Sequence, residues 1–211
     1  MTHRSAPDLL ALHGVRILGF AATPAVARRV ALDPADTEEL LRDAEAYGWV
    51  QHAQFADLGG WSLTERGRAQ DELLLADELT RVGGRDEVRD VYRSFLPLNG
   101  RLQQACTDWQ LRPTPGDRLA GNDHSDAAWD ARVLDELTAI DGGLGPLVTR
   151  LAGLLARFGG YDERFAAARR RAAAGEAGWV DGTHVDSCHR VWFELHEDLV
   201  ATLGISRQDD A

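Results

Sequence analysis

Apolar residues recur at helical spacing in three short segments near the start of the chain. The first segment runs over residues 5–17, with a proline and an acid at its beginning; the second follows Thr23-Pro24; the third runs over residues 37–47 behind a second proline turn. Prolines and acids are favoured in the first turn of a helix, and glycine or another proline commonly follows its end. The pattern therefore predicts three consecutive helices.

The period then changes from that of a helix to that of a strand. We expect Trp49, Val50, His52 and Gln54 to form one short strand and residues 61–63 a second, with Gly59-Gly60 between them as the turn of a hairpin. Thr64 can accept hydrogen bonds from the first amides of a further helix ending near Val82. The order predicted for residues 1–83 is helix, helix, helix, hairpin, helix.

From Gly83-Gly84 onward the pattern is helical throughout. Two adjacent glycines between periodic segments favour a domain boundary, so we expect one domain over 1–83 and a second over 84–211. In the second domain Pro97 and Gly142-Gly143 are expected to end helices, and residues 112–125 to form a loop. Short joints between amphipathic helices are typical of a bundle. The fold class predicted is mainly α, with one small hairpin and an all-helical C-terminal domain.

The charge balance restricts the partners of this chain. It has 34 acidic residues against 23 arginines, has no lysine, and carries a net charge of −11; residues 1–84 alone hold 13 acids and 8 arginines. Because contacts with phosphates supply most of the non-specific affinity of proteins for DNA, a DNA-binding surface here would have to be a local basic stripe.

The two cysteines, Cys106 and Cys188, lie far apart in the sequence and neither belongs to a CxxC motif. We therefore expect no disulfide framework and no thiolate metal site, which fits a reducing cytoplasm. The most apolar early stretch is interrupted by a proline and two arginines, so neither export nor a membrane span is predicted. No metal and no cofactor is expected.

The hairpin and the residues behind it resemble a known family of DNA-binding proteins. The stretch Trp61-Ser62-Leu63-Thr64-Glu65-Arg66-Gly67-Arg68 matches the Trp-x-Leu-Thr-x-x-Gly-Arg pattern with which MarR-like winged helix-turn-helix regulators often leave the wing. The resemblance covers roughly residues 1–80. It implies a winged helix-turn-helix domain over 1–83 that binds double-stranded DNA, with residues 37–47 as the recognition helix in the major groove.

On this resemblance, five residues are candidates for DNA contacts. We expect Thr37, Glu38 and Arg42 to reach base edges, and Arg28 and Arg29 to bind phosphates. The helix carrying the first three also bears many acids. The alternative is that this is an acidic helix that contacts another protein.

The C-terminal part has a resemblance of its own. The tail Trp-Phe-Glu-Leu-His-Glu-Asp-Leu-Val-Ala-Thr-Leu-Gly, residues 192–204, resembles actinobacterial proteins that pair a winged helix with a helical C-terminal domain, and so do residues 107–113 and 121–126. That likeness implies the two-domain layout but brings no activity with it. A similar winged helix also accompanies some pyruvate phosphate dikinase-like enzymes.

Aromatic and polar side chains from helix ends in the second domain predict a small-molecule pocket. The combination of flat apolar walls with a few directional polar groups is typical of such pockets, and a guanidinium favours an anionic ligand. The residues expected to converge are Trp109, Arg112, Asn122, His124, His189, Trp192 and His196. The alternative is that the last three belong to an aromatic stripe in the core. Two histidines seven residues apart on a helix are separated by about 10 Å, too far to share a metal ion.

No catalytic signature is present, neither a phosphate-binding glycine loop nor a Gly-x-Ser-x-Gly or His-Glu-x-x-His motif, so the chain is not expected to be an enzyme. His124 could perform acid–base work with His189 or His196, but a capping Asn-Asp turn with an incidental histidine is the commoner arrangement. The function predicted is a homodimeric, DNA-binding transcription regulator that responds to a small anionic effector. The alternative is an accessory or ligand-binding protein that does not bind DNA.

Overall fold

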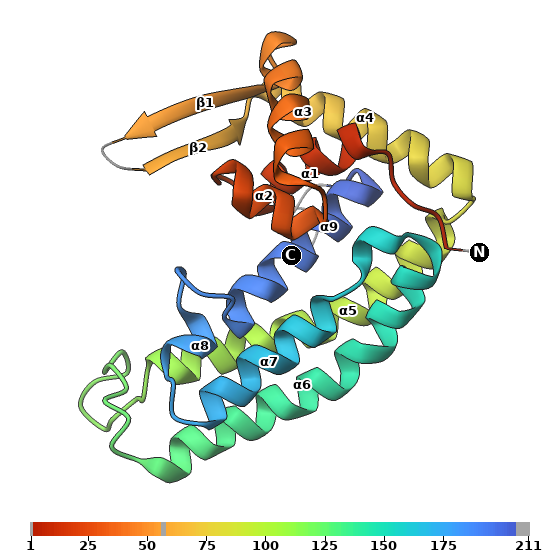
Figure 1. Ribbon diagram of the computed structural model, residues 1–211. Coiled ribbons are helices and arrows are strands. Elements are labelled where there is room, and N and C mark those ends of the chain that lie inside the picture. The colour runs from red at the N-terminus through yellow and green to blue at the C-terminus, as the bar shows by residue number, and fades with distance from the viewer. Residues whose placement is uncertain (1, 56–57, 206–211) are drawn as a thin grey trace. The chain divides into compact units, whose positions relative to one another are not determined.

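The computed structural model describes residues 2–55 and 58–205, except for the side chains of residues 55 and 58. The described chain is mainly helical and contains one two-stranded antiparallel sheet (Figure 1). It divides into two compact units. Unit 1 holds the described residues of 1–88, 153–157 and 196–211; unit 2 holds residues 89–152 and 158–195.

Unit 1 begins with three helices that share one core. They are α1 (Pro7–Leu18), α2 (Thr23–Val30) and α3 (Pro34–Ala46). Asp33 caps α3 by accepting hydrogen bonds from the backbone N–H groups of Ala35 (2.8 Å) and Asp36 (3.4 Å), so this helix begins before the expected Thr37. The core that these helices form with the hairpin comprises Ala11, Leu12, Val15, Ala21, Val26, Leu41, Ala44, Val50 and Trp61.

The predicted hairpin is confirmed, but its glycines have a different role. Strand β1 (Val50–Phe55) pairs antiparallel with β2 (Leu58–Leu63), with Ala53 opposite Gly60, so both expected turn glycines lie within β2. The turn predicted at Gly59-Gly60 is therefore wrong, and residues 56–57 between the two strands lie outside the described residues. A Cβ at Gly60 would lie 2.7 Å from the ring of Phe20, so glycine at this position permits the close approach that lets Ala21 bridge to Trp61.

Helix α4 (Glu65–Val82) starts as the sequence predicts. Thr64 Oγ1 accepts a hydrogen bond from the N–H of Gly67 at 3.0 Å, and Gly83, with φ of 63°, follows the last turn. A Cβ at Gly67 would lie 1.7 Å from the carbonyl oxygen of Trp49, which accepts a hydrogen bond from the N–H of Thr64. Glycine is therefore required where the first turn of α4 meets the chain that enters β1.

The predicted buried face of α4 was wrong. The apolar spacing indicated Ala69, Leu73, Ala76, Leu79 and Val82, but Leu73 is 62% exposed and only Leu79 of the five is buried. The buried side chains include two acids, and the buried residues are Gly67, Asp71, Leu75, Glu78 and Leu79. Two carboxylates thus occupy interior positions that sequence patterns assign to apolar residues.

Two segments distant in sequence complete unit 1. Residue 3 pairs with 155 as an isolated parallel bridge: the N–H of His3 donates to the carbonyl of Leu154 (3.0 Å), and the N–H of Ala156 donates to that of His3 (2.9 Å). Residues 196–203, the second half of α9 (Cys188–Leu203), contribute Ala201 to a cluster with Leu9 and Leu75. The compact units therefore differ from two consecutive domains that meet at residue 83.

Unit 2 is built from helices and a long loop. Its elements are most of α5 (Arg85–Gln110) and α6 (Ala127–Leu154), with α7 (Tyr161–Ala173), the short α8 (Gly178–Asp181) and the first half of α9; a 3₁₀ turn, Ala156–Phe158, precedes α7. At its centre the ring of Trp192 lies 4.7 Å from that of Phe95 and 5.7 Å from that of Phe165. The indole N–H of Trp192 donates to Asn99 at 2.9 Å, so its polar atom is satisfied within the core.

Two predicted helix ends in unit 2 were wrong. Helix α5 continues through Pro97, and α6 continues through Gly142-Gly143. A Cβ at Gly143 would lie 3.1 Å from the side chain of Leu98, so glycine there allows α6 to pass close to α5 beside the proline. Burial of apolar faces along the full length of both helices outweighs the local cost of about 3 kcal/mol for an interior proline and about 1 kcal/mol for a glycine.

We predict that Gly67→Ala destabilises the protein by about 1–3 kcal/mol, because the added methyl group must displace the Trp49 carbonyl or the start of α4. Gly100→Ala is the matched control: Gly100 lies within α5, has no neighbour that a Cβ would meet, and should gain up to about 1 kcal/mol of helix propensity. Urea denaturation of both variants measures the two effects. Equal stability of Gly67→Ala and wild type would contradict the packing argument.

Candidate functional site

The first candidate surface is the outer face of α3, where DNA contacts are predicted. Thr37 does not take part: its side chain is fully buried, and its hydroxyl donates to the carbonyl of Asp33 at 2.7 Å. This corrects the expectation that it reaches a base edge. Because α3 begins at Pro34, Thr37 lies within the helix and not before it, and its spacing of four and seven residues from Leu41 and Ala44 puts it on their buried face.

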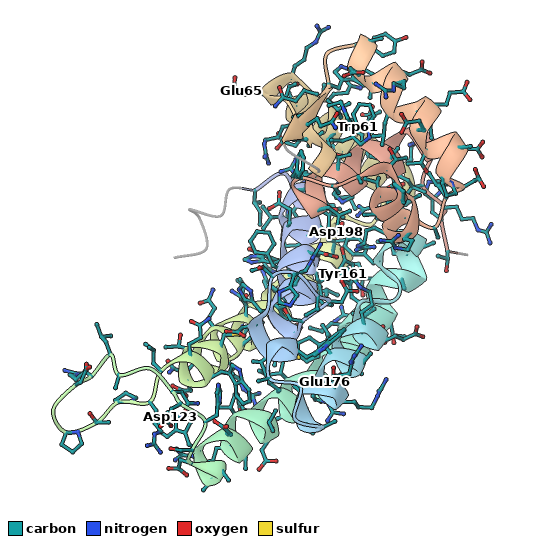
Figure 2. All side chains as sticks on the ribbon, turned by 60° about the vertical axis from the view of Figure 1, so that its left-hand side comes forward. Trp61, Glu65, Asp123, Tyr161, Glu176 and Asp198 are labelled. Atoms are coloured by element: carbon teal, nitrogen blue, oxygen red, sulfur yellow. The ribbon has the colours of Figure 1, made fainter. Side chains whose placement is uncertain are left out.

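Arg42 lies on the exposed side of α3 between two carboxylates. Its Nε donates to Glu38 (3.0 Å) and its NH1 to Glu45 (3.1 Å), and the guanidinium lies 4.9 Å from the ring centroid of Trp61 (labelled in Figure 2). Glu38 also accepts a hydrogen bond from the hydroxyl of Thr23. That hydrogen bond, with those from Arg42, lowers the pKa of Glu38 below its usual value, so the carboxylate is ionised.

The two arginines of α2 differ in their surroundings. Arg28 is exposed, as a phosphate contact requires. Arg29 is half-buried, and its positive charge is among those that depress the pKa of the buried Asp198. Arg29 therefore acts on a buried carboxylate of unit 1, and its role as a phosphate contact stays a prediction.

The second candidate site is the loop between α5 and α6 in unit 2. Its centre is Asn122, whose amide donates to the backbone carbonyl of Trp109 (3.0 Å) and to Asp130 (2.9 Å), and whose oxygen accepts from the N–H of His124 (3.1 Å). The ring of His124 lies 4.5 Å from that of Trp109, and its Nδ1 lies 2.9 Å from Asp130. The structure therefore brings together three of the predicted residues and adds Asp130.

His124 combines a constrained ring with an unusual backbone. Its φ is +58°, a left-handed conformation uncommon for residues other than glycine, and it is held there by the hydrogen bonds of Asn122 and Asp130. Because Asp130 binds Nδ1, the other ring nitrogen, Nε2, is oriented outward on an exposed side chain. A histidine oriented by a carboxylate can accept or donate a proton.

Arg112 lies beside this cluster and contacts a capping residue. Its NH1 donates to Asp126 at 2.9 Å, and the other oxygen of Asp126 accepts from the N–H groups of Ala128 and Trp129, so Asp126 caps α6. These backbone hydrogen bonds, together with the charge of Arg112, lower the pKa of Asp126. Asp123, labelled in Figure 2, lies in the same loop.

We expected the remaining three predicted pocket residues to join the loop cluster, but they do not. His189 is exposed, Trp192 is buried in the helical core with Asn99, and His196 belongs to unit 1. The predicted inward stripe of α9 is thereby corrected: Phe193 is exposed. The buried residues of α9 are Cys188, Val191, Trp192, Leu195, Leu199, Val200, Ala201 and Leu203 among the apolar ones, with Glu194 and Asp198 among the acids.

Two surface hollows of unit 2, of about 390 and 490 Å³, contain none of the seven predicted residues. The larger is lined by Asp141, Gly145, Asp162, Glu163, Ala166 and Arg170. The smaller lies between α5 and α6, where Arg132 packs over Trp129 and Arg101 pairs with Glu136 at 2.6 Å. Its polar groups are thus already engaged with one another.

Metal and thiol chemistry find little support in the described structure. No group of three histidine, cysteine, aspartate or glutamate residues that could hold a metal ion occurs among the described residues. Cys106 and Cys188 are both buried free thiols, and burial raises the pKa of each to about 12, so neither is a ready nucleophile.

A third cluster, which the sequence analysis missed, is buried in unit 1. His13 lies between two carboxylates, Asp71 and Asp198, while Arg16 and Arg157 contact the same acids. A signal was present in the sequence: Asp71 and Glu78 are seven residues apart and share a helix face with Leu75, and Asp198 is flanked by Leu195 and Leu199. Acids at the apolar positions of two helices indicate a buried ionic network.

Comparison with protein-family models, with curated proteins and with solved structures finds no match to this chain. Within the described residues, no helix has the length and apolar character needed to cross a membrane. Function is therefore inferred from the contacts on α3, in the loop between α5 and α6, and around His13.

We predict that Asn122→Ala loosens the loop, because it leaves the Trp109 carbonyl and the N–H of His124 without their partner, at a cost of about 1–3 kcal/mol. Limited proteolysis should cut the 111–126 segment faster, with a lower midpoint of thermal unfolding. Ser125→Ala, which removes only a hydroxyl bonded to Asp123, is the control and should behave like wild type. Cleavage of both variants at the same rate would argue against a central role of Asn122.

Proposed function

We propose that unit 1 contains a winged helix-turn-helix and that the protein is a cytoplasmic, DNA-binding transcription regulator. The observation that carries the proposal is the order α1, α2, α3, β1, β2, α4 together with the bridge between Ala21 and Trp61. The bridge places the segment between α1 and α2 beside β2, as a short third strand. This is the layout of MarR-like regulators, in which α3 would be the recognition helix and the hairpin the wing.

The chemistry of α3 suggests how DNA would be contacted. Glu38 presents an ionised carboxylate, which can accept a hydrogen bond from the amino group of cytosine in the major groove. Arg42, which is 55% exposed, would exchange its contacts with Glu38 and Glu45 for a phosphate or a guanine. Arg28 supplies the other exposed positive charge of the predicted set. The few cations and many acids imply weak non-specific binding and a strong dependence on the right sequence.

We predict that Arg42→Ala weakens binding to the DNA upstream of the protein's own gene and lowers the slope of log affinity against log salt by about one. The control is Arg93→Ala, because Arg93 is an exposed arginine of unit 2 in a similar pair with an acid three residues away. Fluorescence anisotropy at several salt concentrations measures both quantities. An Arg42→Ala variant with the wild-type affinity and slope would remove α3 from the interface.

Unit 2 is the proposed sensor for a small anionic effector. Arg112 is the group suited to bind the anion: its guanidinium contacts one carboxylate, Asp126, and is only partly buried. The loop cluster of Trp109, Asn122 and His124 lies along the same segment. An anionic ligand would compete with Asp126 for the planar donor pattern of Arg112.

The proposed regulator is a homodimer, because two-fold operators are read by two-fold dimers. Helix α4 offers the contact, since Leu73 is 62% exposed. We predict that Leu73→Glu reduces the mass measured by light scattering at micromolar concentration from that of a dimer to that of a monomer. Leu119→Glu is the control, because Leu119 is 76% exposed but lies in the loop of unit 2. A monomeric wild type would contradict the proposal.

A second candidate function is favoured by one observation: Arg42 is already neutralised by two carboxylates of its own helix. In that case the acidic outer side of α3, which also carries Asp36, Glu39 and Asp43, would contact a basic surface of another protein. The DNA titration distinguishes the two functions. Binding that declines steeply with salt supports the regulator, and absence of binding at low salt favours the protein contact.

A further inference from the structure

The buried cluster in unit 1 contains a histidine whose two ring nitrogens both face carboxylates. Nδ1 of His13 lies 3.2 Å from Asp71 Oδ2, and Nε2 lies 3.1 Å from Asp198 Oδ1. His13 is only 2% exposed. The three residues come from α1, α4 and the second half of α9, so the imidazole joins three helices of unit 1 at one point.

This geometry determines the protonation state. A neutral imidazole has one N–H donor and one acceptor, whereas an ionised carboxylate can only accept. Two hydrogen bonds to two ionised carboxylates therefore require both ring nitrogens to carry protons.

Both carboxylates have reason to be ionised. Asp71 Oδ2 also accepts from NH1 of Arg16 at 3.2 Å, and Asp198 also accepts from NH1 of Arg157. Burial alone would favour a protonated Asp198, but the charges of Arg157 and His13 outweigh it and hold its pKa far below the usual range. Each aspartate thus accepts hydrogen bonds from an arginine as well as facing the imidazole.

The charged groups around His13 come from every element packed against it, and acids outnumber the arginines. Arg16 also donates to Glu197 (2.9 Å) and Glu72 (3.0 Å), and Arg157 also donates to Glu78 (3.2 Å). Among the described residues, the charged and titratable groups linked to this cluster include His3, Arg16, Arg29, Arg68, Asp71, Glu72, Glu78, Arg157, Glu197 and Asp198. Removal of the proton from His13 leaves a negative excess and one carboxylate without its donor.

We propose that His13 is a buried imidazolium that locks residues 196–203 of α9 onto α1 and α4, and that loss of its proton in alkaline solution releases this segment. Burial by itself disfavours the charged ring, but the charges of Asp71 and Asp198 and the hydrogen bonds to them outweigh it, and the pKa of His13 is raised above its ordinary 6.5. A raised pKa in the folded state contributes stability that is fully present below the ordinary value and disappears as the pH rises through the folded one.

The direct test is a nuclear magnetic resonance titration of the ring nitrogens of His13 in the full chain, from about pH 6 to about pH 9, a range that spans the ordinary histidine pKa. The expected result is that both nitrogens are protonated at neutral pH and that the ring titrates above the ordinary histidine value of 6.5. One protonated nitrogen at neutral pH, or titration at or below the ordinary value, would overturn the proposal.

Release of the segment is measured by hydrogen exchange in the same pH range. After correction for the intrinsic effect of pH, exchange of the 196–203 amides should accelerate as His13 titrates, while that of α7 in unit 2 should not. The lock is refuted if His13 titrates as expected and the 196–203 amides stay protected.

Variants add a second readout. His13→Gln, which keeps one donor and one acceptor but no charge, should expose the 196–203 amides already at neutral pH and abolish the pH dependence. His189→Gln, on an exposed position of α9, should leave both unchanged. If His13→Gln does not fold, the titration and the hydrogen exchange of the wild-type protein still show whether loss of the His13 proton releases residues 196–203.

Discussion

Burial of charge is the constraint on which unit 1 depends. Asp71, Glu78 and Asp198 lie almost completely out of contact with solvent, and an uncompensated ion in such a place costs several kcal/mol. Each is tolerated because a cation from another segment reaches it. Arg157 alone contacts Glu78, Asp198 and the hydroxyl of Thr202.

That requirement explains why unit 1 is not a continuous stretch of chain. A winged helix built from residues 1–83 alone would leave the acids of α4 without Arg157 and His13 without Asp198. The parallel bridge between residues 3 and 155 holds the segment that carries Arg157 at the place where Glu78 needs it. The second half of α9 brings Asp198 for the same reason. In other proteins, replacement of a buried ionic network by apolar side chains of similar volume is often neutral or stabilising. The network here therefore specifies how the segments of unit 1 are arranged more than it adds to stability.

The sequence predicts correctly those features that depend on residues close together in the chain. The hairpin, the cap of Thr64 on α4, Gly83 at its end and the cap of Asp126 on α6 all follow from hydrogen bonds within a few residues. The misassigned features depend on distant partners. Pro97 does not end α5, because α6 covers it at Leu98, and the buried face of α4 includes acids whose cations come from elsewhere in the chain.

In the candidate sites too, contacts between residues close in sequence were predicted, and contacts between distant residues were not. Trp109, Asn122 and His124 are near each other in the sequence, and the loop brings them together. His189 and His196 were assigned inward because they lie seven apart on one helix face, but His189 is exposed and His196 is half-buried, while Trp192 between them is buried. The buried side chains of Cys188, Val191 and Leu195 in unit 2 set the rotation of α9 about its own axis. The directions of the two histidines follow from that rotation.

In the DNA complex proposed for α3, carboxylates and phosphates would compete for one arginine, Arg42. The pair of contacts that Arg42 makes with Glu38 and Glu45 lies at the surface, where ion pairs are screened by solvent and contribute little to stability. A phosphate on DNA offers a comparable ion pair and, in addition, releases counterions, which favours the exchange at low salt. The remaining acids of α3 oppose it by repelling the same phosphates. An acidic recognition helix of this kind binds only where base contacts, such as a cytosine amino group on Glu38, add to the single arginine, and its discrimination between sequences would therefore exceed its affinity for DNA in general.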